Sequence, residues 1–132
     1  MFFAAQKVIP YMKKNSWGRI INISSLAGRM GGYANGLAYS ASKAGIIGLS
    51  QGLAYRIADS KITVNSVAPG TTESSIIDQF SEEKKAELKK MIPIGRFGQP
   101  ADTANLVVFL SSELAGFITG AVIDINGGMY MG

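Results

Sequence analysis

Three short runs of aliphatic and β-branched residues alternate along the chain with longer segments in which apolar residues recur at helical spacing. The apolar runs, each flanked by turn residues, are residues 19–25, 62–68 and 120–125. The segments with helical character are residues 1–14, 38–58, 81–91 and 100–112. Strands separated by helices of this length are typical of crossover units. We therefore predict an α/β fold with a parallel sheet and flanking helices.

Two details refine this prediction. In the first run, Ile20, Ile21 and Ile23 place apolar side chains on both faces of the predicted strand. This pattern is typical of a strand that is covered on both faces. Residues 26–37 contain four glycines together with Asn35, and no apolar periodicity. We predict a loop over residues 26–37.

Composition narrows the chemistry that the chain can perform. Its 132 residues, 47% hydrophobic and 17% charged, are typical of one globular domain. It contains no Cys and no His, which excludes a disulfide framework, a Cys/His zinc site and a Ser-His-Asp triad. We expect no metal site. Catalysis by this chain must therefore use hydroxyls, carboxylates, amides, Lys or Arg.

Charge and hydropathy bear on partners and location. The net charge is +4, but the lysines of residues 84–90 are offset by nearby glutamates, so we predict no nucleic-acid surface. The longest apolar candidate, residues 44–58, is interrupted by Ser50, Gln51 and Arg56, so we predict no membrane span. The start of the chain lacks the features of a secretory signal. We therefore expect a cytoplasmic protein.

Tyr39 and Lys43 are four residues apart in a predicted helix, which places their side chains on one face. A nearby ammonium group favours the ionised form of a phenol, so Tyr39 is a candidate proton donor or acceptor in a chain without His. The spacing alone is weak evidence, because such pairs also arise by chance in helices.

The surroundings of this pair strengthen the interpretation. Ser24 and Ser25 lie at the carboxyl end of the first predicted strand, and residues 69–72 lie at that of the second. The helix with Tyr39 and Lys43 connects these two strands. Because ligands of open parallel sheets bind beyond the carboxyl ends of the strands, we predict that these polar groups converge on one site.

Six ordered segments, spread over most of the chain, resemble the short-chain dehydrogenase/reductase family. They are INISS at 21–25, YSASKA at 39–44, NSVAPG at 65–70, GRFGQP at 95–100, ITG at 118–120 and NGG at 126–128. Within the family the resemblance is to 3-oxoacyl-acyl-carrier-protein reductases, which serve fatty acid biosynthesis, and to related sugar or polyol dehydrogenases. It implies a Rossmann-type fold and hydride transfer between NADP or NAD and a carbonyl/alcohol substrate.

The resemblance also implies roles for individual residues. Tyr39 would exchange the proton with the substrate oxygen, and Lys43 would assist it and hydrogen-bond the nicotinamide ribose. Ser25, rather than its neighbour Ser24, would hold the substrate oxygen. The residues implied at the nicotinamide are Pro69, Gly70, Thr72 and Ser74, the last standing where the family commonly has Thr. Family members are homo-oligomers, so a dimer or tetramer is implied.

The sequence lacks two features of the family. Its glycine-rich cofactor turn and its Asn-Asn-Ala-Gly segment do not occur here. We therefore predict that residues 1–132 are the C-terminal part of a single NAD(P)-binding Rossmann-type domain whose N-terminal half is missing. Such a piece would be weakly active or inactive, with an unpaired apolar edge at residues 20–23. The alternatives are a non-catalytic oligomerisation module and a gene remnant.

Three further patterns have competing interpretations. Residues 48–52 match the Gly-x-Ser-x-Gly elbow of hydrolases, but they lie within a predicted helix and no His can serve as the base. Ala44, Gly48 and Gly52 form a small-residue stripe that favours an oligomer contact over packing within the chain. Residues 74–94 are either a mobile lid over the substrate or a solvated charged face.

Overall fold

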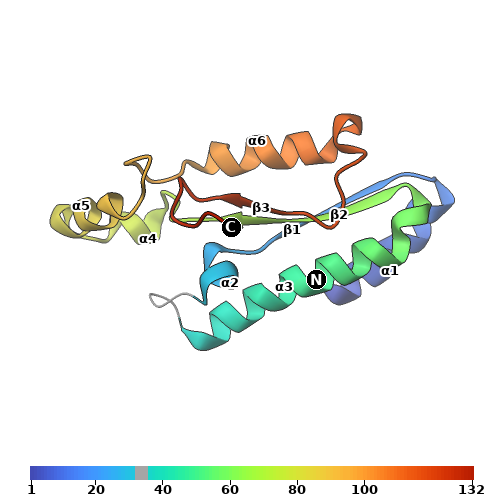
Figure 1. The fold of residues 1–132 in the computed structure, drawn as a ribbon, viewed down its shortest axis with the longest axis horizontal. Coiled ribbons are helices and arrows are strands. Elements are labelled where there is room, and N and C mark those ends of the chain that lie inside the picture. Colours follow the sequence, from blue (N-terminus) through green and yellow to red (C-terminus); the bar gives the residue numbers. More distant parts are fainter. Residues whose placement is uncertain (32–35) are drawn as a thin grey trace.

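A three-stranded parallel sheet in the order β1-β2-β3 forms the centre of the computed structural model, which describes residues 1–31 and 36–132. Its strands are β1 (Gly18–Ile23), β2 (Ile62–Pro69) and β3 (Val122–Ile125). The helices α1 (Phe2–Lys14) and α3 (Leu37–Ile57) cover one face, and α6 (Pro100–Ser111) covers the other (Figure 1). This arrangement confirms the predicted α/β architecture with a parallel sheet.

β2 is the central strand, and its side chains form the core on both faces. Val64 packs with Ala54 and Ile57 of α3 on one face. Val67 packs with Leu110 of α6 on the other face. This division follows from the alternation of side chains along a strand. β1 pairs only with β2 among the described residues, so it lies at the edge of the sheet, as the sequence predicts.

Asn65 is a fully buried polar residue in the middle of β2. Its side-chain amide donates a hydrogen bond of 2.8 Å to the carbonyl oxygen of Ile118, and its side-chain oxygen accepts one of 3.1 Å from the backbone amide of Ala121. Both partners lie in the segment that leads into β3. The Asn65 side chain therefore joins β2 to this segment before the strand pairing begins.

The prediction of a loop over residues 26–37 was wrong in its first part. Residues Leu26–Met30 form a short helix, α2. The Oγ atom of Ser25 caps its start by accepting a hydrogen bond of 3.2 Å from the amide of Ala27, and Gly31, at φ 77°, ends it in the left-handed conformation. The remainder of the predicted loop includes residues 32–35, which lie outside the described residues.

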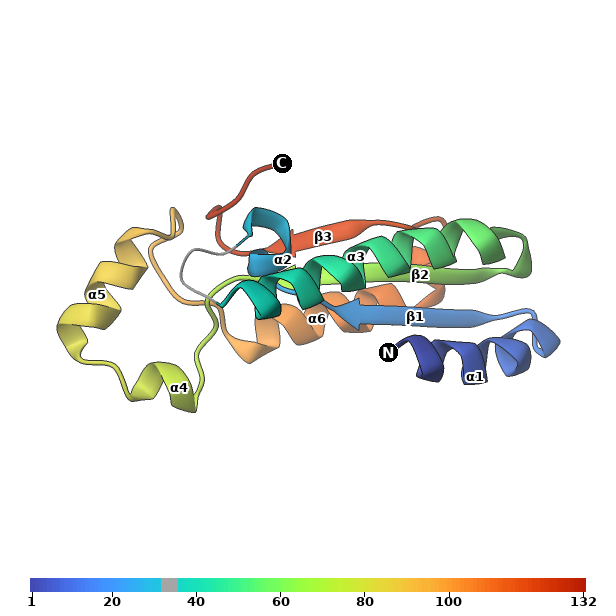
Figure 2. The ribbon, with the colours of Figure 1, turned by 90° about the horizontal axis from the view of Figure 1, so that it is seen from below.

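The segment between β2 and α6 lies beyond the carboxyl end of the sheet (Figures 1 and 2). It contains α4 (Ser75–Asp78), which the sequence pattern did not predict, and α5 (Glu82–Lys90), which it did. Two short 3-10 helices, Ala58–Ser60 and Glu113–Ala115, complete the described elements. Within the described residues, no helix has both the length and the apolar character required to cross a membrane.

Candidate active site

Lys43 connects the first turns of α3 to the end of β1. Its Nζ atom donates a hydrogen bond of 3.2 Å to the carbonyl oxygen of Ile23, the last residue of β1. The same Nζ lies 5.6 Å from the centroid of the Tyr39 ring, within the range of a cation–π contact. The Tyr39 side chain remains 45% exposed, so solvent or a ligand can reach it. The ammonium group therefore lies between the phenol and the end of the strand.

The two serines after β1 have different surroundings. Ser24 is buried, and its hydroxyl donates a hydrogen bond of 2.7 Å to the carbonyl oxygen of Lys43. Ser25 is partly exposed, and its Oγ accepts the capping bond from Ala27. The hydroxyl proton of Ser24 is thus engaged within the chain, whereas the bond at Ser25 leaves its own proton available for donation.

Gly28 allows α2 to lie directly against α3 at Lys43. A Cβ atom at this position would lie 2.7 Å from the carbonyl carbon of Lys43 and 2.9 Å from the Oγ of Ser24. Cβ atoms essentially never make non-bonded contacts that short, so a larger residue would displace α2. Sequence reasoning assigned Gly28 only to a loop, because a close approach between segments leaves no local pattern. The contact brings Ser25 and Lys43 into one neighbourhood.

The residues predicted to bind nicotinamide follow β2. Gly70 donates a hydrogen bond of 3.0 Å to the carbonyl oxygen of Ile125, and a Cβ atom on it would lie 2.9 Å from Cα of Asn126. Pro69 is the last residue of β2. Ser74 is exposed at the start of α4 and makes no capping hydrogen bond with its side chain.

Thr72 forms an isolated parallel bridge with Gly98. The bridge uses the carbonyl of Thr71 and the amide of Glu73, which bond to the amide and carbonyl of Gly98. Because backbone groups alternate in direction along an extended segment, the amide and carbonyl of Thr72 point the other way. One donor beside one acceptor matches a carboxamide group, so this segment fits the nicotinamide that the resemblance implies.

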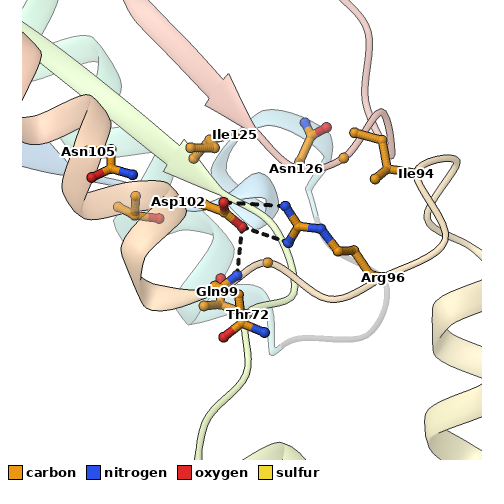
Figure 3. A pocket seen from close by; sticks show the side chains of 11 residues that line it. Thr72, Ile94, Arg96, Gln99, Asp102, Asn105, Ile125 and Asn126 are labelled. Atoms are coloured by element: carbon orange, nitrogen blue, oxygen red, sulfur yellow. Dashed lines mark hydrogen bonds and ion pairs between the residues drawn. The ribbon is translucent and has the colours of Figure 1, made fainter.

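A cavity of ≈ 250 Å³ lies next to this segment, between α6 and the end of β3 (Figure 3). Thr72 is the one predicted site residue that lines it; Ser25, Tyr39 and Lys43 do not. Arg96 and Asp102 both line the cavity. The Arg96 guanidinium donates two hydrogen bonds to the Asp102 carboxylate, of 2.7 Å from Nη1 and 3.3 Å from Nη2. The Asp102 carboxylate also accepts a hydrogen bond of 2.7 Å from the amide of Gln99, which caps α6.

The Arg96 hydrogen bonds, together with that from the Gln99 amide, lower the pKa of Asp102 below its usual range. Sequence reasoning did not predict the Arg96–Asp102 pair. The available signal was the acid three residues after Gln99, at the start of a helix that begins with Pro100. Because the two charges satisfy one another, the pair holds the loop before α6 in place.

Two sequence motifs lie on α3: the Gly-x-Ser-x-Gly match at residues 48–52 and the small-residue stripe. Ser50 is buried, donates a hydrogen bond of 2.7 Å to the carbonyl oxygen of Ile46, and accepts one of 2.8 Å from the side-chain amide of Asn22. It is a structural hydroxyl rather than a nucleophile. A Cβ atom at Gly48 would meet no described atom within 4 Å, so this part of the small-residue stripe does not pack against another element of the described chain.

Comparison with known proteins identifies the class to which this fold and site belong. The model of a family described as enoyl-(acyl carrier protein) reductase matches residues 1–130. The chain therefore belongs to the short-chain dehydrogenase/reductase family, whose members are NAD(P)-dependent oxidoreductases.

Individual relatives give a finer picture. The chain is 47% identical over 129 residues to a 3-oxoacyl-[acyl-carrier-protein] reductase of Aquifex aeolicus, covering 98% of this chain and 52% of that protein. It is 47% identical over 133 residues to the enzyme of the same name from Staphylococcus aureus, covering 99% and 53%. A crystal structure of the Brucella melitensis enzyme of that name superposes with a TM-score of 0.93 at 34% identity, covering 99% of this chain and 49% of that one. The chain thus spans about half the length of these relatives.

Proposed function

We propose that this chain carries the proton-transfer half of an NAD(P)-dependent carbonyl reductase that acts on 3-oxoacyl thioesters. The observation that best supports the proposal is the position of Lys43, whose Nζ is bonded to Ile23 and lies over Tyr39. This contact gathers a phenol, an ammonium group and the end of β1 beside Ser25. The names of the relatives support the substrate class.

Tyr39 is the proposed proton donor to the substrate oxygen during reduction and the acceptor during oxidation. Its O–H is carried on the exposed first turn of α3. The ammonium of Lys43 lies beside the ring and is the proposed partner for the negative charge that develops as the proton is transferred. Lys43 has three N–H donors, and the bond to Ile23 uses one of them, so others are available for the ribose of a cofactor.

Ser25 is the proposed anchor for the substrate oxygen. Its Oγ accepts from Ala27 and so points its own O–H proton elsewhere. A hydroxyl proton donated to a carbonyl oxygen polarises the bond that is reduced and fixes the distance to Tyr39. The bound nicotinamide would supply the hydride chemistry. Pro69, Gly70, Thr72 and Ser74 would hold its ring, with the backbone of Thr72 facing the carboxamide.

A Tyr39→Phe variant tests the proposal. We expect reduction of a 3-oxoacyl thioester by NADPH or NADH to fall by a factor of about 100 or more, with little change in KM. Tyr55→Phe is the matched control, because Tyr55 lies on the same helix and is 89% exposed. Undiminished turnover in the Tyr39 variant would contradict the assignment. Cofactor binding by the unsubstituted chain is measured in parallel, because the chain spans half the length of its relatives.

A second proposal concerns assembly: the face formed by α1 and α3 contacts a second copy of the chain. A cavity of ≈ 240 Å³ on this face is lined almost entirely by apolar side chains, namely Phe2, Ala5, Gln6, Ile9, Pro10, Leu49 and Leu53. Gly48, one residue before Leu49, is exposed. This face would serve both an oligomeric enzyme and a non-catalytic oligomerisation module.

Sedimentation equilibrium tests the assembly proposal. We expect Gly48→Arg to shift the chain to monomers, because a charged side chain would enter the contact. Ala86→Arg on α5 is the control, since Ala86 is also exposed on a helix but lies away from this face. Equal masses for the Gly48 variant and the parent chain would overturn it.

A further inference from the structure

Arg29, in the last turn of α2, makes contacts with β3 and with the C-terminal residues. Its Nη2 atom lies 3.2 Å from Oδ2 of Asp124 on β3. Its Cζ atom lies 4.9 Å from the centroid of the Tyr130 ring, and Nη2 also lies 3.5 Å from the carbonyl oxygen of Gly132. Both views of the chain show the C-terminal end beside α2 (Figures 1 and 2). One guanidinium thus links α2 to β3 and to the C-terminal residues that follow β3, all of them distant from α2 in sequence.

The ion pair is largely shielded from water. The side chains of Arg29 and Asp124 are 21% and 17% exposed. Nε of Arg29 and Oδ1 of Asp124 are buried without a hydrogen-bond partner among the described residues. The Asp124 carboxylate therefore depends on Arg29 for charge compensation, whereas Arg29 also contacts Tyr130 and Gly132. Removal of one partner would leave the remaining charge buried and uncompensated, which is more costly than loss of an exposed pair.

The element that Arg29 holds also carries the proposed substrate anchor. α2 has only five residues, too few to be stable without tertiary contacts. Ser25 caps its first turn, Gly28 rests on Lys43, and Arg29 fixes its last turn to β3. A series of contacts runs from Asp124 through α2 to the hydroxyl of Ser25, over a helix barely longer than one turn.

We propose that Arg29 is a positioning residue, which acts through Asp124 and Tyr130 to hold α2, and with it the Ser25 hydroxyl, in the place needed for substrate binding. This role rests on the proposed function of Ser25. We call the contacts of Arg29 with Asp124, Tyr130 and Gly132 the clamp. Its effect on α2 can be measured without turnover. The C-terminal residues Tyr130 and Gly132 are part of it, so the end of the chain contributes to the geometry of the site.

Hydrogen exchange tests the clamp directly. The amides of Gly28 and Gly31 are bonded within α2, to Ser25 and Ala27, so their exchange reports on its opening. In Arg29→Met and in Asp124→Asn, we expect peptides that cover α2 to exchange roughly tenfold to a hundredfold faster, as loss of a largely shielded ion pair predicts. Peptides of α6 should keep their rates. A chain that ends at Met129 provides an independent variant, with smaller acceleration expected in α2.

Arg19→Met is the matched control. Arg19 also stacks on an aromatic ring, with Cζ 5.1 Å from the Trp17 centroid, and also donates to a backbone carbonyl, that of Ser112. It lies at the opposite end of β1 from Ser25. We expect its loss to leave α2 exchange unchanged. Equal acceleration of α2 in the Arg19 and Arg29 variants, or no acceleration in either, would overturn the clamp.

Kinetics separate positioning of Ser25 from a merely structural role. If Ser25 anchors the substrate, Arg29→Met should lower kcat/KM for a 3-oxoacyl thioester about tenfold at a temperature where the variant is folded. Arg29→Lys, which keeps the charge, should restore part of it, and Arg19→Met should match the parent chain. Accelerated exchange with unchanged kcat/KM would refute the positioning role. Absence of turnover in the unsubstituted chain would bear on the proposed function and not on the clamp, whose existence hydrogen exchange then decides alone.

Discussion

The hydroxyl of Ser24 donates a hydrogen bond of 2.7 Å to the carbonyl oxygen of Lys43. This bond ties the end of β1 to α3 two turns into the helix, at the residue whose side chain faces Tyr39. The neighbouring hydroxyl, that of Ser25, caps α2 instead. Two adjacent serines therefore hold different parts of the same site.

The different surroundings of the serines predict different mutational effects. Ser24→Ala should lower the free energy of unfolding by about 1 kcal/mol, because it removes one buried hydrogen bond. Ser25→Ala should cost a similar amount through loss of the cap, but should additionally reduce carbonyl reduction about tenfold or more. Urea unfolding and steady-state kinetics on both variants make the comparison. Equal loss of turnover in the two variants, at equal folded fraction, would count against Ser25 as the substrate anchor.

The close approach of Gly28 to Lys43 predicts that even alanine at position 28 destabilises the fold. Gly28→Ala introduces a Cβ atom 2.7 Å from the carbonyl carbon of Lys43, so α2 must shift away from α3. We expect a loss of about 1–3 kcal/mol in the free energy of unfolding, as is typical of overpacked sites.

Gly45→Ala is the matched control for Gly28→Ala. Gly45 lies within α3, and a Cβ atom there would meet no described atom within 4 Å. Alanine is a better helix former than glycine, so this variant should be more stable by about 0.5–1 kcal/mol. The two substitutions are chemically identical, and opposite signs in urea unfolding are the expected outcome. Destabilisation of the same size at both positions would show that the contact at Lys43 is not the cause.

The Arg96–Asp102 pair predicts a defined pH dependence of stability. The pKa of Asp102 is below its ordinary value of 3.8 in the folded chain, so the folded state binds the proton more weakly than the unfolded state. The stabilisation is therefore complete above about pH 4 and is lost as the pH falls through the lower, folded pKa. Thermal unfolding of the parent chain and Asp102→Asn should converge in acid. A constant difference in Tm from pH 7 to pH 2 would contradict this assignment.

Two interpretations of residues 74–94 remain predictions: a mobile lid over the substrate and a solvated charged face. The helices of this segment lie beyond the carboxyl end of the sheet (Figure 2), and it exposes Ile76 and Met91 at 66% and 52%. The exposed pairs Lys84–Glu87 and Lys85–Glu82 agree with a solvated face. If the segment closes over a ligand, NADPH with substrate should slow hydrogen exchange in α4 and α5 but not in α1. Identical exchange with and without these ligands would favour the solvated face alone.

The strands and long helices could be predicted because each leaves a periodic signal in the sequence. The run of β-branched residues at 62–68 corresponds to β2, and the helix predicted at 38–58 corresponds to α3, with its last residue in a 3-10 turn. α2 could not be predicted in this way, since five residues with Gly28 inside are too few to display a period. Its helical state depends on the Ser25 cap and on tertiary contacts.

The members of the candidate site were predicted by motif, but not their contacts. That Lys43 bonds to Ile23 depends on the separation of α3 from β1, which Gly28 and Ser24 set across the fold. The same holds for Arg29 and Asp124, which lie 95 positions apart in the numbering and show no local pattern. Local propensity identifies elements, whereas distances between elements arise only when they pack.

The buried amide of Asn65 restricts how the last strand can be placed. A slip of one residue in the segment before β3 would separate this amide from both Ile118 and Ala121, leaving a donor and an acceptor unsatisfied in the interior. Alternative pairings of β3, a strand of only four residues, would thus be disfavoured. The Asn65 side chain therefore fixes the register of β3, and this register places Asp124 opposite Arg29.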